Sequence, residues 1–161
     1  MPTSVALLGM AILVAVLLRG VLLLVLPTPL NAPAPLIIGV GIAVTLLFLK
    51  AVLGLAHHPE RFTQTATAVF GYQIVLAPAL IATGWLFLTV GENPTWQLPA
   101  LILRLAVEVW ALAVSSRILR SATGWPLFAC VALAIVNELL TFLAIAAFVP
   151  QADTPGVAAP V

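Results

Sequence analysis

The sequence predicts an all-α membrane protein, a polytopic bundle of five transmembrane helices. Of 161 residues, 63% are hydrophobic and only 7% are charged, whereas a soluble domain carries roughly 25% charged residues. Apolar stretches of about 20 residues, the length that spans a bilayer, recur along the whole chain. The net charge of +1 provides no field that would attract nucleic acid. We therefore expect the partners to be the lipid bilayer and other membrane proteins or further copies of this chain.

Proline, glycine and charged residues divide the chain into five apolar segments, each long enough for the roughly 17 to 25 residues of a span. The first lacks preceding basic residues and exceeds the usual length of a signal-peptide core, so we expect a retained helix. The segments form one transmembrane domain over 1–149, and a Pro- and Ala-rich tail, 150–161, is expected to be disordered. The predicted spans are residues 5–26, 36–56, 66–90, 98–118 and 127–149.

The connections between the spans carry turn-forming residues. Residues 27–35 contain four prolines in nine residues, which cannot continue a helix and suit an extended link. Residues 91–97 contain an Asn-Pro turn signal. In the second connection, His57 and His58 are adjacent, so their side chains point in different directions and rarely converge on one metal ion. We interpret this stretch as a solvated loop, with a metal or catalytic site as the less favoured alternative.

The cations indicate the orientation of the spans. Lys50 and Arg61 flank the second connection, and Arg117 and Arg120 flank the fourth, whereas the first and third connections contain no Lys or Arg. By the positive-inside rule, the N-terminus is cytoplasmic and the C-terminus is outside. For a bacterial source this corresponds to the inner membrane. The alternative is four spans with the first segment lying in the interface, which Arg19 within that segment favours.

The third span combines small residues with a central proline. Ala66, Ala68 and Gly71 permit close approach of another helix, and they precede Tyr72 and Gln73. Pro78 is expected to kink the span and free a backbone carbonyl. The simplest interpretation is a kinked helix at a tight helix–helix contact.

The pattern of Ala68, Gly71, Tyr72 and Pro78, followed by an apolar run, resembles a segment of the Yip family of Ypt/Rab-interacting membrane proteins. Five spans with a cytoplasmic N-terminus are also similar to that family. The resemblance implies an integral membrane scaffold or adaptor. Such a protein would act through helix packing and short cytoplasmic loops.

Ionisable residues within the spans are the strongest functional signal. Arg104 and Glu108 are at i and i+4, on one face of the fourth span. Glu108 and Glu138 lie at the midpoints of their spans, and both arginines lie about 5 to 6 Å outward of a midpoint. A formal charge of zero suits pairing within a bundle. The predicted intramembrane network consists of Arg19, Arg104, Glu108 and Glu138, with Asn137 beside them.

Two functions follow from this network. If the charges only pair with one another, they fix helix packing in a scaffold, which is the preferred interpretation. If they line a cavity, the protein is a small oligomeric transporter or channel. A water-accessible cavity at Glu108 and Glu138 would distinguish the two. The sequence contains no phosphate-binding loop, zinc-protease motif or nucleophile elbow, so we expect neither an enzyme nor a bound cofactor or metal.

Overall fold

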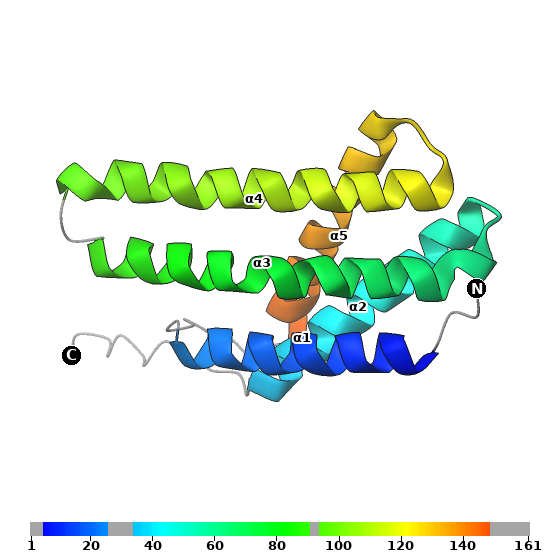
Figure 1. Cartoon of the computed structure of the whole chain (residues 1–161), viewed down its shortest axis with the longest axis horizontal. Coiled ribbons are helices and arrows are strands. Elements are labelled where there is room, and N and C mark those ends of the chain that lie inside the picture. The colour runs from blue at the N-terminus through cyan, green and yellow to red at the C-terminus, as the bar shows by residue number, and fades with distance from the viewer. Residues whose placement is uncertain (1–4, 26–33, 91–93, 149–161) are drawn as a thin grey trace, which may run out of the picture.

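A computed structural model describes residues 5–25, 34–90 and 94–148, which are helical apart from short turns (Figure 1). The predicted tail, 150–161, lies outside the described residues. Four helices, α2 to α5, are long and apolar enough to cross a membrane, and the apolar stretch found in α1, Val5–Val21, is shorter. The elements are α1 (Val5–Val25), α2 (Ala34–Leu55), the 3₁₀ turn η1 (Pro59–Arg61), α3 (Phe62–Val90), α4 (Pro94–Thr123) and α5 (Leu127–Phe148).

Helices α3 and α4 extend beyond their predicted spans. Helix α3 begins at Phe62, four residues before the predicted span, and the hydroxyl groups of its polar N-terminal turns bond to backbone carbonyls one turn earlier. The hydroxyl of Thr65 donates to the carbonyl of Arg61 at 2.9 Å, and that of Thr67 donates to Thr63 at 2.7 Å. An apolar window identifies the part of a helix that suits lipid, whereas hydrogen bonding continues the helix into the polar ends.

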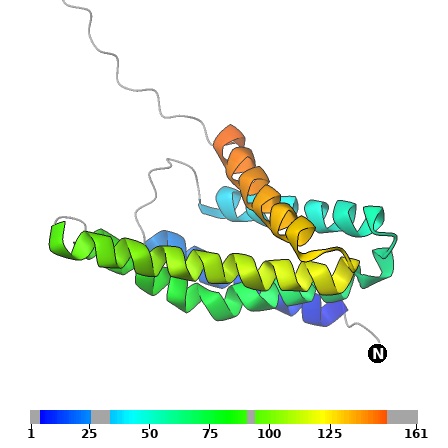
Figure 2. The same ribbon diagram turned by 90° about the horizontal axis from the view of Figure 1, so that it is seen from above.

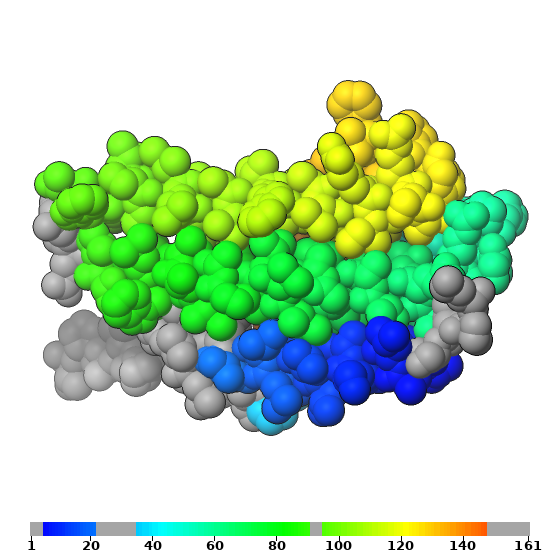
Figure 3. Space-filling model, viewed as in Figure 1, coloured from blue at the N-terminus to red at the C-terminus, as the bar shows by residue number. Residues whose placement is uncertain are grey.

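The helices form two layers. Helices α1, α3 and α4 lie side by side with α3 in the middle, and α1 and α3 run opposite to α4 (Figure 1). Helices α2 and α5 contact each other and cross one face of this layer (Figure 2). On the opposite face, the side chains of α1, α3 and α4 form three parallel ridges (Figure 3). The second layer thus covers one side of the first.

The buried core lies where α2, α3, α4 and α5 converge. Its small residues, among them Ala66 and Cys130, are fully buried and let the helices approach closely. The described N-terminal half of α4 is different, because Ala100 is its one buried residue between positions 95 and 110. The bundle is therefore closely packed near the α4–α5 turn and open at the other end of α4. The core residues are Leu49, Ala66, Val69, Leu119, Cys130 and Ala134.

A pair of helix caps forms the polar end of the bundle. At the end of α2, His57 has a left-handed backbone (φ 58°), and the N–H groups of His57 and His58 bond to the carbonyls of Gly54 and Leu53 at 3.1 and 2.9 Å. These two bonds define a Schellman cap. At the end of α4, Gly124 (φ 73°) bonds to the Arg120 carbonyl at 2.9 Å. His57 therefore occupies a position that usually requires glycine.

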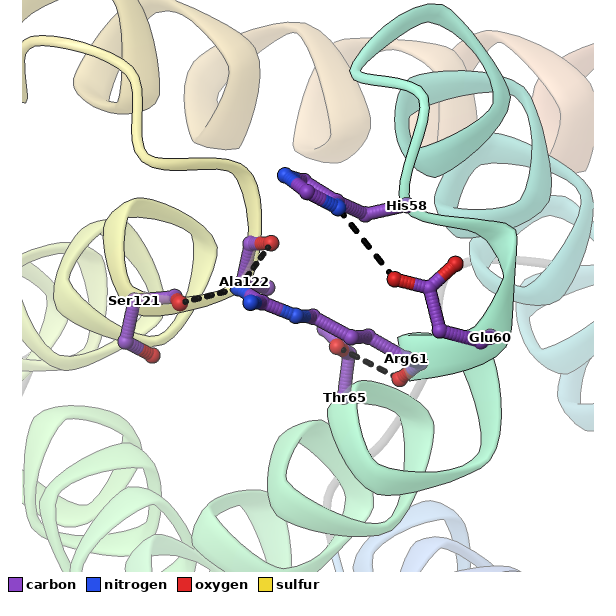
Figure 4. Close-up of polar contacts among 6 residues, drawn as sticks. All are labelled: His58, Glu60, Arg61, Thr65, Ser121 and Ala122. Atoms are coloured by element: carbon purple, nitrogen blue, oxygen red, sulfur yellow. Dashed lines mark hydrogen bonds and ion pairs between the residues drawn. The ribbon is translucent and has the colours of Figure 1, made fainter.

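Arg61 joins these two helix ends (Figure 4). Its Nη1 donates to the carbonyls of Ser121 and Ala122 at 3.3 and 3.2 Å, in the last turn of α4. Beside it, His58 Nδ1 lies 3.2 Å from a Glu60 carboxylate oxygen. A hydrogen bond to its own backbone, and then the contact with His58, lower the pKa of the Glu60 carboxyl. This arrangement orders the predicted solvated loop.

Candidate functional site

Polar side chains from four helices line a cavity of about 170 Å³ within the bundle. Helix α1 contributes Arg19, α3 contributes Tyr72 and Gln73, α4 contributes Glu108, and α5 contributes Glu138. The volume is large enough for several water molecules. Three residues of the predicted charge network thus meet at one cavity.

Arg19 reaches across three helices. Its Nη2 donates to Gln73 Oε1 at 3.1 Å. Its Nη1 lies so close to α2 that a Cβ built on the buried residue Gly41 would be 3.1 Å from it. A side chain at position 41 would therefore displace the guanidinium. The glycine makes room for Arg19 beside α2.

Among the carboxylates of the described residues, Glu138 is the one without a hydrogen-bond or ion-pair partner. It forms no hydrogen bond and no ion pair within 4 Å with any residue of the described ranges, although it interacts electrostatically with Arg19 and Glu108. Its side chain is exposed between α4 and α5. An unpaired carboxylate in a span is costly unless water or a ligand reaches it. Glu138 is accordingly the group in this site that is free to bind something else.

Arg104 forms an ion pair with Glu108 and forms none with Glu138. Its Nη2 and Nε lie 2.9 and 3.1 Å from the same oxygen, Oε1 of Glu108. The two side chains remain 37% and 48% exposed. The i, i+4 spacing of Arg104 and Glu108 favours pairing within α4. The cation that interacts electrostatically with Glu138 is therefore Arg19, from α1.

Pro78 adds a backbone acceptor to the cavity. It lies inside the continuous helix α3 and has no N–H, so it cannot donate to the carbonyl of Ile74, four residues earlier. Ile74 lines the same cavity. A carbonyl freed in this way is a ligand for a small cation or for water.

Asn137 lies outside this cavity. Its Oδ1 is buried and has no hydrogen-bond partner in the described part of the chain. It lines a smaller space of about 20 Å³, together with Thr45 and Ser115. That space is large enough for about one water molecule. Tyr72 and Glu138 line both spaces, so Asn137 lies next to the cavity without lining it.

Of the small residues predicted to permit close helix approach, Ala66 is fully buried, whereas Ala68 and Gly71 do not face a closely packed helix of the described chain. Ala68 is exposed, and a Cβ added to Gly71 would meet no described atom within 4 Å. The packed side of α3 instead contains Thr65, Ala66 and Val69. In a helix, residues two positions apart point about 200° apart, so a small residue near a packed one need not face the same neighbour.

Three residues of the site are not marked as such by the sequence pattern: Gly41, Gln73 and Ile74. Gln73 was grouped with helix packing, and Gly41 carried no charge to mark it. Pro78 was a usable signal, because the carbonyl it frees is always four residues earlier.

Among the described residues, no group of three His, Cys, Asp or Glu side chains could hold a metal ion. No family model, curated protein or solved structure matches this chain.

Proposed function

We propose that the protein is a small membrane transporter or channel in which Glu138 binds a proton or a small cation. The observation that carries this proposal is the cavity shared by Arg19, Glu108 and Glu138, in which Glu138 has no partner in the described ranges. A scaffold would keep its intramembrane charges paired and dry. Ionisable groups that line a cavity within spans typically belong to ion or proton pathways.

The lining of the cavity favours a cation over an anion. Two carboxylates and one guanidinium face it, and Arg19 already donates to Gln73. Glu108 is paired with Arg104. Two charges in the lining have no ion-pair partner among the described residues: Arg19, which is engaged with the amide of Gln73, and Glu138, which has no polar contact, so the carboxylate is the charge open to a ligand. The Ile74 carbonyl adds a neutral acceptor, and oxygen ligands suit hard cations.

An ion-flux assay in liposomes tests this function. Purified protein is reconstituted, and the movement of H⁺, Na⁺ and K⁺ is followed under an imposed gradient. We expect flux of at least one of these ions, and we expect Glu138→Gln to abolish it. Glu60→Gln, a change at an exposed loop carboxylate, is the matched control and should retain it. Absence of flux for all three ions in the parent protein would contradict the proposal.

A labelling experiment tests Glu138 independently of transport. Dicyclohexylcarbodiimide modifies carboxyl groups in apolar surroundings, and mass spectrometry identifies the modified residue. We expect modification of Glu138 to slow in the presence of the transported cation. Unchanged labelling at a saturating concentration of that cation would show that Glu138 does not bind it.

We also propose five spans, with a cytoplasmic N-terminus and, in a bacterium, a place in the inner membrane. Arg61 contacts the end of α4 that carries Arg117 and Arg120, which supports one cationic side. The test uses single cysteines in a Cys130→Ser background and an impermeant thiol reagent on intact cells. We expect Asn93→Cys to react, and His58→Cys and Thr3→Cys to remain unlabelled. If Thr3→Cys were labelled while His58→Cys stayed unlabelled, the result would favour four spans with α1 on the outer surface.

A non-enzymatic scaffold or adaptor, as the resemblance to the Yip family implies, is our second proposal. The contact between Arg61 and the end of α4 supports it, because this contact gives two loops one defined polar surface for a partner protein (Figure 4). Capture of partners from native membranes tests it. We expect Arg117→Ala together with Arg120→Ala to weaken capture. Glu138→Gln should leave it unchanged, and the opposite pattern would favour the transporter.

A further inference from the structure

The Arg104–Glu108 pair on α4 is only half satisfied. Both hydrogen bonds end on Oε1 of Glu108, so Oε2 accepts none from the described residues. The guanidinium has five N–H donors, and three of them are unused in this pair. Both side chains are more than one-third exposed. At mid-span, contact of these groups with lipid costs several kcal/mol, so something polar must cover them.

The residues around the pair form a stripe typical of a helix–helix contact. Leu101, Arg104, Leu105 and Glu108 stand at i, i+3, i+4 and i+7, which places them on one face of α4. Leu101 and Leu105 are 40% and 54% exposed. We call these four residues the α4 seam. An apolar stripe with one pair of opposite charges at its centre fits another transmembrane helix better than it fits lipid.

We propose that a second copy of this chain covers the α4 seam by packing its own α4 against it. A twofold axis along the membrane normal sets the two Arg104 side chains at one depth and the two Glu108 side chains about 6 Å away along the helix, so each guanidinium reaches along the α4 seam to Glu108 of the other copy as well as to its own. The four side chains then form a ring of alternating charges. This ring gives Oε2 of each Glu108 a donor and each guanidinium a second acceptor. Twofold dimers are the commonest assemblies of identical chains.

The second copy also completes the wall of the site. A groove of about 490 Å³ lies between α4 and α5 and contains both Glu108 and Glu138. Leu139 and Phe142, also in this groove, are 54% and 69% exposed. A helix on the α4 seam covers the groove from the side and separates the two acids from lipid. The dimer stands independently of which ion, if any, the cavity carries.

Disulfide cross-linking in native membranes tests this interface. In a Cys130→Ser background, Leu105→Cys places a thiol on the α4 seam and Leu103→Cys places one on the other side of the same helix. The two leucines are 54% and 47% exposed and lie about 200° apart around α4, so they are matched in chemistry and depth. Under a mild oxidant we expect most Leu105→Cys chains to become linked dimers and Leu103→Cys chains to stay monomeric. Equal cross-linking at the two positions would overturn the proposal.

Two charge variants test whether the ring holds the dimer. Arg104→Leu with Glu108→Leu should reduce cross-linking of Leu105→Cys to the level of Leu103→Cys. The exchange Arg104→Glu with Glu108→Arg keeps one acid and one base on the α4 seam, so it should retain cross-linking. It also serves as the control that a chain with two changes in the seam still folds. Undiminished cross-linking of the double leucine variant, or its loss in the exchange variant, would overturn the role of the charges.

Discussion

At the scale of single residues, His57 shows a conflict between side chain and backbone. A left-handed conformation costs a residue with a Cβ roughly 1 to 2 kcal/mol, whereas glycine adopts it freely. His57 nevertheless has φ 58°, because the two hydrogen bonds of the Schellman cap hold it there. The polar loop that the sequence predicted is therefore a structured helix end.

Replacing His57 with glycine should stabilise the protein. We expect a gain of about 0.5 to 1 kcal/mol in the free energy of unfolding, visible as a higher melting temperature in detergent. His58→Gly is the matched control, because His58 has φ −125° and its change relieves no strain. An unchanged or lower melting temperature for His57→Gly would show that its side chain makes a compensating contribution.

Glu60 should titrate below the ordinary carboxyl pKa of about 4.3. The hydrogen bond to its own backbone and the contact with His58 both lower its pKa. A carboxyl that is more acidic in the folded state stabilises the fold above its ordinary pKa, and this contribution disappears as the pH falls through the lowered pKa. Carboxyl NMR titration measures the value. His58→Ala should raise the pKa only in part, because the backbone bond remains.

At the scale of helices, polar contacts at the ends decide how neighbouring elements are joined. The last carbonyls of a helix have no donor within it, and a cation near them is favoured by the helix dipole. Arg61 satisfies two such carbonyls of α4 from the end of η1, just before α3. One side chain thereby links the second and fourth connections of the chain.

Removing Arg61 should loosen the end of α4. We expect Arg61→Ala to lower the free energy of unfolding by about 1 kcal/mol and to speed hydrogen exchange in the last turn of α4. Arg117→Ala is the control, since Arg117 is exposed and its change should leave that turn protected. Equal exchange in the two variants would mean that Arg61 does not cap α4 in the membrane.

Pro78 should weaken its helix and serve the site. Pro78→Ala restores an N–H to the Ile74 carbonyl and should stabilise α3 by roughly 1 to 3 kcal/mol. We expect the same change to weaken cation protection of Glu138 against carbodiimide. Pro99→Ala provides the comparison, because Pro99 lies inside α4 but does not line the cavity. Unchanged protection in Pro78→Ala would remove the Ile74 carbonyl from the site.

At the scale of the whole molecule, balanced charges let a marginal span remain in the membrane. We expect Arg104→Leu to destabilise the protein by roughly 2 to 3 kcal/mol, because it leaves Glu108 unpaired among apolar side chains and lipid. Adding Glu108→Leu should recover part of that loss. Thermal unfolding of the two single variants and the double variant in detergent measures both effects. If Arg104→Leu were as stable as the parent, the pair would have to lie in water.

The sequence by itself determined the helical class and the approximate position of every helix, because apolar length and punctuation by proline and charge are local properties. Local spacing also determined that Arg104 and Glu108 share one face of α4. Only the tertiary structure decided that Arg19 bonds to Gln73, that Gly41 makes room for it, and that Glu138 has no close partner in the described part of the chain. These contacts depend on how α1, α2 and α5 cross the other helices, and apolar spans of similar hydropathy do not encode which of their faces will meet.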